Sequence, residues 1–398
     1  MADKILSPEE FYKKVNKEDK DAIIDLKNRK IIEFIPTGSW VLNSLIGDGT
    51  MTGKPGGLPR GHITEVFGDE SSGKTTLVLS ACKQVQELGG LAILVDFEQT
   101  FHADYTEKLG VNLDPKKFML IQPRHFQHGA RLIRDCLSMR PMFIAIDSVS
   151  AMTPKEVLEG DVDEAGRIGL QAQLMSAFLS YMSKFLKDSN VCVAFTNQIR
   201  SVIKKSKFQM GPDEESSGGR ALKYYSSVRI KLKTSTVEKI NVKSKITGKM
   251  EKEPINVMIK ASIVKNKIDK PWRAAPVYIR FSEGFDNIQS IIELAINTGV
   301  IKKAGAFFTF AHGGENLIKE QGKEQLWKVL NENEKLIVKL RDSLVIKEDQ
   351  QTKEEYKDID DDNEELKDDI DDVLSNVSSN FIKKQEEKKK KSKEGPEE

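Results

Sequence analysis

Between His62 and Thr196 the chain alternates short apolar runs with stretches of helical periodicity. The apolar runs have the length of strands and cover 62–67, 91–95, 142–146 and 191–196. The stretches between them repeat apolar residues with the spacing of one helical face, at 75–88, 130–137 and 170–186. Strands that alternate with helices pair in parallel, because each helix returns the chain to the same edge of the sheet. The sequence therefore predicts an α/β fold with a mostly parallel sheet and helices on both faces.

The remaining sequence predicts what surrounds this core. Further strands are expected at 228–232 and 255–264, and the lysine-rich stretch 239–254 is typical of either a hairpin or a surface loop. We divide the chain into an N-terminal oligomerisation segment with a short helix and strand, a core, a small α+β C-terminal domain and a disordered charged tail, at 1–36, 37–284, 285–345 and 346–398. The small domain is expected to hold helices around a β-like patch, at 288–297, 324–344 and 306–310.

Charge and composition narrow the class of protein. Residues 347–398 hold 19 acidic and 11 basic residues, so the formal net charge of +1 for the whole chain leaves +9 on residues 1–346. A basic body of this kind attracts polyanions. Cys82, Cys136 and Cys192 have no metal-ligand spacing and are expected to be reduced core thiols. No signal sequence or run of about 18 apolar residues occurs, which predicts a cytoplasmic protein with no membrane partner.

A glycine-rich segment connects the first predicted strand to the first predicted helix. It reads Gly68-Asp69-Glu70-Ser71-Ser72-Gly73-Lys74-Thr75 and fits G-x-x-x-x-G-K-[ST]. Its glycines let backbone N–H groups converge on a phosphate, and the helix N-terminus adds a positive dipole. Lys74 would reach the β- and γ-phosphates, and the Thr75 hydroxyl would ligate Mg²⁺. The segment predicts a site for a nucleoside triphosphate.

Polar residues at other strand ends supply the parts that hydrolysis needs. Ligands of open α/β sheets bind at the carboxyl ends of the strands. Asp147 follows the run 142–146 and suits the Mg²⁺-binding acid of the Walker-B motif, while Glu98 follows 91–95 and is a candidate general base. Gln198 ends the last run and is a candidate for contact with the γ-phosphate. Alone, each acid is more often a helix cap or a solvated loop residue.

The motifs together resemble bacterial RecA recombinases over about residues 35–345. The segments that carry the resemblance are Phe67–Thr76, Asp96–Glu98, Asp147–Pro154, Thr196–Arg200, Gly218–Tyr225, Val264–Lys267 and Lys302–Ala306. The resemblance identifies the chain as a member of a bacterial or phage RecA-type family. It implies a RecA-like ATPase core within 37–284, with ATP and Mg²⁺ as cofactors.

The resemblance also implies roles for individual positions. Glu98 would activate water, and Tyr105 would stack on the nucleotide base. Thr76 closes the segment that resembles the family's phosphate loop and would help to bind the nucleotide. Gln198 would couple the γ-phosphate to the ordering of a DNA-binding loop. Lys265 and Lys267 would reach into the ATP site of the neighbouring subunit, as an arginine finger does in trans. Without the resemblance, two lysines that alternate at a strand end are more typical of a solvated strand end.

Two loops are predicted to hold DNA. The first is 159–169, with Ile168 near its end, and the second is 199–217, which leads into Gly218 and Gly219. The second loop interleaves cations with apolar residues, as single-strand binding requires; the candidates are Arg200, Lys204, Lys205, Lys207 and Phe208. Such a loop is also compatible with simple solvation. Gln173 occupies a family position where arginine is expected, and is the remaining candidate for a DNA contact.

The resemblance implies self-assembly into a head-to-tail helical filament on single-stranded DNA, with a homologous duplex as the exchange partner. A heterologous interface that does not close produces a filament. Residues 31–35 would add a strand to the neighbour's sheet, although a purely local N-terminal role fits equally well. The acidic segment 347–372 would either compete with DNA for the basic body or act as an inert solubility tail.

Several positions depart from the family pattern. His102 stands where an acid is usual, both loops are longer than expected, and the lysine-rich run 383–393 is an unusual ending. These departures predict a divergent member from a phage or an organelle, located in the host cytoplasm if phage-encoded. Two other classes remain open: a ring-forming helicase-like motor on the same core, and a nucleotide-gated scaffold that binds single-stranded DNA without turnover.

Overall fold

The computed structural model describes residues 7–18, 31–47, 56–160, 164–201, 214–216, 220–243 and 249–345. The chain divides into two compact units between Ile291 and Ile292. The first contains a large central sheet, and the second contains a smaller antiparallel sheet with helices. The described part of the chain includes no helix with both the length and the apolar character needed to cross a bilayer.

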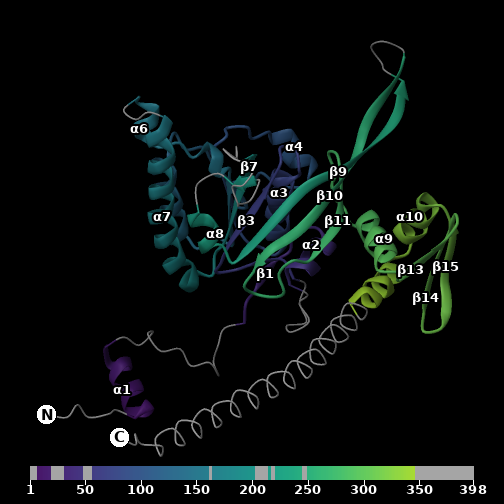
Figure 1. Cartoon of the computed structure of the whole chain (residues 1–398), viewed down its shortest axis with the longest axis horizontal. Coiled ribbons are helices and arrows are strands. Elements are labelled where there is room, and N and C mark those ends of the chain that lie inside the picture. Colours follow the sequence, from purple (N-terminus) through teal and green to yellow (C-terminus); the bar gives the residue numbers. More distant parts are fainter. Residues whose placement is uncertain are drawn as a thin grey trace, which may run out of the picture. The chain divides into compact units, whose positions relative to one another are not determined.

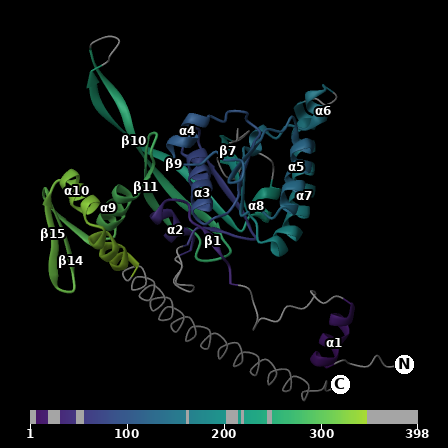
Figure 2. The same ribbon diagram turned by 180° about the vertical axis from the view of Figure 1, so that it is seen from behind.

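The central sheet has the strand order β12-β11-β10-β9-β3-β7-β6-β4-β5, with β8 beside β7. Figures 1 and 2 show its neighbouring strands β11, β10 and β9. The strands from β9 to β5 along this order pair in parallel. They are β3 (Ile63–Gly68), β4 (Ala92–Asp96), β5 (Phe118–Ile121), β6 (Phe143–Asp147), β7 (Cys192–Ser201) and β9 (Val228–Lys243). The antiparallel members are β8 (Glu214–Ser216), β10 (Met250–Asn266), β11 (Ala274–Arg280) and β12 (Gly284–Asp286). The predicted mostly parallel sheet is confirmed.

Helices cover both faces of the parallel strands. Helices α5 (Phe126–Ser138) and α7 (Glu164–Ser189) share one apolar cluster with strands β4, β6 and β7, which includes Phe178, Ile93 and Ile144. Helix α3 (Lys74–Glu87) contacts the same strands but contributes nothing to that cluster. Because side chains alternate across a strand, α3 packs on the opposite face. The three cysteines are buried and unbonded, as expected for core thiols.

Shorter elements complete the first unit. They are α1 (Pro8–Glu18), β1 (Phe34–Ile35), α2 (Trp40–Ile46), β2 (Leu58–Pro59), α4 (Ala103–Lys108), a 3₁₀ turn (Val149–Ala151), α6 (Lys155–Leu158) and α8 (Ala221–Tyr225). Residues 34 and 35 pair with β2 of the same chain, so this part of the predicted 31–35 strand has a local partner. Strand β9 runs to Lys243, eleven residues beyond the predicted 228–232. It forms a hairpin with β10, so the hairpin alternative for 239–254 is the correct one.

In the second unit, strands β13 (Ile301–Ala304), β14 (Phe307–His312) and β15 (Glu315–Gln321) form an antiparallel sheet. The predicted β-like patch at 306–310 therefore covered only part of this three-stranded sheet. Helix α9 (Asn287–Asn297) spans the division between the units. The single helix predicted at 324–344 is wrong: α10 (Lys323–Glu332) ends before Asn333, and another helix covers 334–345.

Candidate active site

The glycine-rich loop connects β3 to α3, as the sequence predicts. Gly73 has φ +86°, which L side chains rarely adopt, and a Cβ there would lie 2.4 Å from Ile279 Cδ1. A Cβ on Gly68 would lie 2.0 Å from the Leu232 carbonyl oxygen. Both positions therefore require glycine for this path of the backbone.

Lys74 lies inside the curve of this loop. Its ammonium group donates to the carbonyl oxygens of Gly68 at 3.1 Å and Asp69 at 2.6 Å. Burial lowers the pKa of Lys74, and the negative charges of Asp147 and Glu98 partly oppose that effect. The loop thus holds a cation facing the acids of the neighbouring strand ends. Asp69, Glu70 and Ser71 are exposed along the loop, while Ser72 is buried and its hydroxyl donates to the Asp69 carbonyl at 2.7 Å.

Asp147 ends β6 beside the first turn of α3. The Thr75 hydroxyl donates to Asp147 Oδ2 at 2.8 Å, and the Thr196 hydroxyl from β7 donates to Oδ1. Burial raises the pKa of Asp147, while the two hydroxyl donors lower it. A hydroxyl and a carboxylate are the oxygen ligands that Mg²⁺ takes from a protein when phosphates and water complete its octahedron. Thr75 and Asp147 therefore fit the predicted metal site. Thr196 was not predicted as a site residue; its place at the end of the strand next to Asp147 was the available signal.

Glu98 is half-buried just past β4. Its Oε1 accepts hydrogen bonds from the Ser148 hydroxyl and from Gln198 Nε2, the latter at 3.4 Å. The Ser148 hydroxyl is also 2.6 Å from that of Ser150. Residues from three strand ends therefore converge on this carboxylate, so one of its oxygens is held in a fixed direction. Sequence reasoning assigned no role to Ser148, although it directly follows the predicted acid Asp147.

A groove runs from the loop toward Tyr105. It is lined by Ser71–Thr76, Tyr105, Val257, Ile279 and Phe281. The Tyr105 hydroxyl lies 2.9 Å from Thr76 Oγ1, and the ring is half-buried. An apolar wall with one aromatic ring suits the flat face of a nucleotide base. Val257, Ile279 and Phe281 were not predicted, because they lie on β10, β11 and the turn after β11, far from the motif in sequence.

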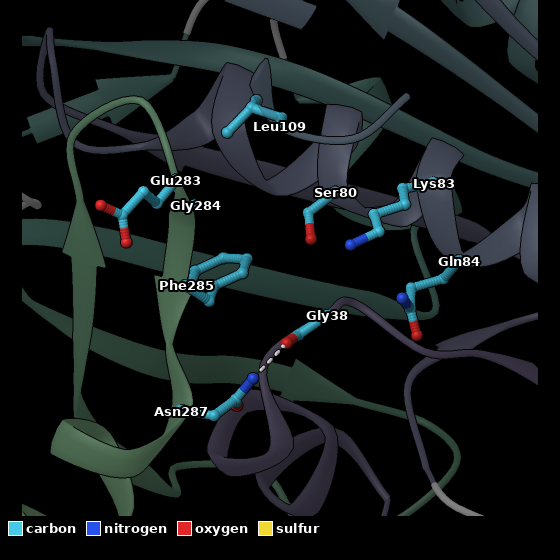
Figure 3. A pocket seen from close by; sticks show the side chains of 9 residues that line it. All are labelled: Gly38, Ser80, Lys83, Gln84, Leu109, Glu283, Gly284, Phe285 and Asn287. Carbon is cyan, nitrogen blue, oxygen red and sulfur yellow. Dashed lines mark hydrogen bonds between the residues drawn. The ribbon is translucent and has the colours of Figure 1, made fainter. Parts of the chain in front are cut away.

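A second pocket lies farther along α3 (Figure 3). Figure 3 shows Ser80, Lys83 and Gln84 of α3 opposite Glu283, Gly284 and Phe285, with Leu109, Gly38 and Asn287 completing the wall. The Asn287 amide donates to the Gly38 carbonyl at 2.8 Å. None of the sequence-predicted site residues lines this pocket. The candidate active site is therefore the groove at the glycine-rich loop.

Two comparisons with known proteins agree with this geometry. The model of the RecA N-terminal domain matches residues 9–286, and that of the RecA C-terminal domain matches residues 289–347. The chain is 36% identical over 311 residues to Protein RecA of Thermus aquaticus, covering 78% of this chain and 84% of that protein. It is also 36% identical over 360 residues to the mitochondrial DNA repair protein recA homolog of Dictyostelium discoideum, covering 86% of this chain and 73% of that protein.

The chain belongs to the RecA family. The resemblance to RecA recombinases that the sequence motifs indicate is confirmed by both family models and by the relatives. RecA family membership makes the chain a RecA-type recombinase of DNA repair.

Lys265 and Lys267 lie away from this chain's own phosphate loop. Strand β10 runs antiparallel to β9, and Lys265 is in register with Arg229, which is itself in register with Glu65 of β3. The two lysines therefore lie at the edge where β3 begins, whereas the loop leaves the edge where β3 ends. The Lys265 ammonium donates to the Lys223 and Tyr224 carbonyl oxygens at 2.5 and 3.1 Å. Burial, and then the nearby Lys267 and Arg229, lower its pKa. Any role of these lysines in an ATP site must involve another subunit.

The predicted DNA contacts fall largely outside the described residues. Lys204, Lys205, Lys207, Phe208, Gly218 and Gly219 belong to the undescribed stretches. Ile168 lies within α7 and Arg200 within β7, but their side chains are not described. Gln173 is exposed on α7. Strands β7 and β8 pair antiparallel at Ile199 and Ser216, so the two ends of the second loop lie side by side.

Proposed function

We propose that this protein is a DNA-dependent ATPase that forms a helical filament on single-stranded DNA and exchanges strands with a homologous duplex. The observation that carries the proposal is the meeting of Asp147, Glu98 and Gln198 beside one phosphate loop. Asp147 accepts from Thr75 of that loop, and Glu98 accepts from Gln198. Membership of the RecA family supports the recombinase part of the proposal.

The residues of the loop would hold ATP with Mg²⁺. Lys74 would exchange its contacts with the Gly68 and Asp69 carbonyl groups for the β- and γ-phosphates. Thr75 and Asp147 would hold Mg²⁺, which neutralises charge that develops on the phosphate oxygens. Tyr105 would pack on the base in the groove.

Glu98 would accept the proton of the attacking water. The Ser148 hydroxyl and the Gln198 amide donate to the same carboxylate oxygen, Oε1. Oε2 would then be the oxygen that receives the proton.

Gln198 would report the state of the nucleotide to the DNA loop. Its amide lies beside Glu98, three residues before β7 ends at Ser201. A contact with the γ-phosphate would compete with the 3.4 Å contact to Glu98. Movement of Gln198 would therefore bias the second predicted DNA loop, which starts at the same strand end.

Lys265 and Lys267 would complete the ATP site of a neighbouring subunit. What supports this role is their place at the opposite edge of the sheet from this chain's own loop. Two cations presented across a boundary would stabilise the charge that spreads over the transferring phosphate. ATP at such a boundary would hold two subunits together in the proposed filament.

Joint-molecule formation between circular single-stranded DNA and linear duplex DNA tests the proposal. We expect product from the wild type with ATP and Mg²⁺, and none from Lys74→Ala. Lys83→Ala is the matched control, because Lys83 lies on the same helix but outside the loop and its ammonium is 3.9 Å from Glu87. Absence of product from the wild type would refute the recombinase proposal.

Two measurements separate the alternative functions. Negative-stain images that show rings in place of filaments would favour a helicase-like motor. Phosphate release that single-stranded DNA does not stimulate would favour a scaffold that binds DNA without turnover. The Asp147–Thr75 and Glu98–Gln198 contacts favour turnover, because a scaffold does not need a positioned base.

A further inference from the structure

The ends of β9 and β10 form a ribbon that extends beyond the rest of the sheet (Figures 1 and 2). Strand β3 pairs with β9 only at Thr64–Gly68, opposite Val228–Leu232, and β11 pairs with β10 only from Asn256 onward. Residues 239–242 and 251–254 pair only with each other among the described strands. The side chains of residues 239–241 and 251–254 are exposed, and Val242 is half-buried.

The two faces of the ribbon carry opposite charge. Side chains alternate across a strand, and directly opposed residues share a face. The pairs Lys239↔Pro254 and Asn241↔Lys252 form one face, which we call the lysine face. The pairs Ile240↔Glu253 and Val242↔Glu251 form the other, which we call the glutamate face. Lys249 lies two residues before Glu251 and reduces the negative charge of the glutamate face at its distal border.

A ribbon of this kind is poorly stabilised on its own. Two strands without a covering layer are marginal in water. Apolar side chains are nonetheless exposed along it: Val237 is 42% exposed, Ile240 46% and Met250 65%. Lys239, Lys252, Glu251 and Glu253 are all exposed as well. A partner that covers the ribbon must therefore offer both apolar surface and charge.

We propose that the lysine face of one subunit packs on the glutamate face of the next subunit. A second copy of the chain offers the complementary surface, because it brings two glutamates with Ile240 and Val242 against two lysines with Pro254. The contact joins two different faces, so it is heterologous and repeats without closing. The inference rests on the proposed filament and adds to it an inter-subunit contact formed by the ribbons.

Nucleic acid is the less favoured occupant. DNA would bind the lysine face through only two described lysines and would leave the glutamate face uncovered on the same thin ribbon. Glu251 and Glu253 flank Lys252 in the sequence and would repel a phosphate backbone. Stacking of ribbons covers both faces at once.

Charge reversal on the full-length protein tests the contact. Filament assembly on oligo(dT) is followed by sedimentation with Mg²⁺ and a slowly hydrolysed ATP analogue, and the protein concentration at which assembly begins is measured. The variants are K239E/K252E, E251K/E253K and the fourfold variant that combines them. K116E/K117E is the matched control for K239E/K252E, because it makes the same change in net charge at exposed residues elsewhere.

We expect each twofold variant to raise the assembly concentration on the order of tenfold, because two favourable ion pairs per contact become repulsive. The fourfold variant should assemble as the wild type does, and an equal mixture of the two twofold variants should assemble better than either alone. DNA-independent ATP turnover should stay unchanged in all of them.

Assembly of either twofold variant at the wild-type concentration, or failure of the fourfold variant to recover, would overturn the ribbon contact. If oligo(dT) affinity below the assembly concentration falls for K239E/K252E and does not recover in the fourfold variant, the lysine face binds nucleic acid instead. If the wild type forms no filament, the proposed function itself is refuted. If all variants assemble at the wild-type concentration, only the ribbon contact is refuted.

Discussion

Replacement of Glu65 by glutamine removes one charge from a buried pair beneath the active site. Glu65 is fully buried on β3, and its Oε2 accepts from Arg229 Nε at 2.5 Å. The Arg229 side chain is only 13% exposed and stacks on the Phe67 ring, with 4.4 Å from its Cζ to the ring centroid. The other oxygen of Glu65 accepts from Asn197 Nδ2 at 3.0 Å. Asn197 precedes Gln198, so this pair supports the residue proposed to contact the γ-phosphate.

Glu65→Gln is expected to lower the free energy of unfolding, because the Arg229 guanidinium stays buried without its carboxylate partner. Removal of one partner of a buried ion pair costs about 3–5 kcal/mol. We expect Glu65→Gln to lower the midpoint of thermal unfolding on the order of 10 °C, since 1 kcal/mol corresponds to a few degrees in a protein of this size. The double variant Glu65→Leu with Arg229→Met should recover most of that loss, because it removes both charges from the interior.

The assay is thermal unfolding of the wild type, Glu65→Gln, the single variants Glu65→Leu and Arg229→Met, and the double variant that combines these last two, followed by circular dichroism. DNA-stimulated ATP turnover of the folded Glu65→Gln protein is measured in parallel and should fall, because Asn197 loses a charged acceptor next to Gln198. A loss below about 1 kcal/mol for Glu65→Gln, or additive losses in the double variant, would refute the argument that this pair is a coupled buried unit.

Three further changes have defined outcomes. Glu98→Gln should leave ATP binding intact and slow turnover at least about a hundredfold, as expected for loss of a general base; near-normal turnover in single-turnover assays would remove Glu98 from that role. Gly73→Ala should abolish binding of a fluorescent ATP analogue, because of the φ of +86° and the 2.4 Å approach to Ile279, and normal affinity would contradict this. Burial first, and then two nearby lysines, lower the pKa of His62, whose Nδ1 is 2.9 Å from Ser227 Oγ. Because the folded pKa is depressed, the neutral imidazole contributes stability above about pH 6.5 that is lost as the pH falls; His62→Asn should flatten this dependence in urea titrations between pH 7 and 5.

The sequence alone determined the elements whose signal is local. The alternation of apolar runs and helical stretches predicted strands β3, β4, β6 and β7 and helices α3, α5 and α7, because periodicity depends on neighbours within one element. The glycine-rich motif located the phosphate loop for the same reason. Asp147 and Glu98 were found because the carboxyl ends of parallel strands meet at one edge of a sheet.

The tertiary structure decided everything that depends on strand pairing. Only the register of β10 with β9 and of β9 with β3 places Lys265 at the edge opposite the phosphate loop. Only side-by-side packing brings Thr196 to Asp147, or Phe281 to the groove beside Tyr105. The pair Glu65 and Arg229 is separated by 164 positions, so no local pattern could join them. Contacts between distant residues are set by the packing of whole elements, and local sequence patterns do not contain that information.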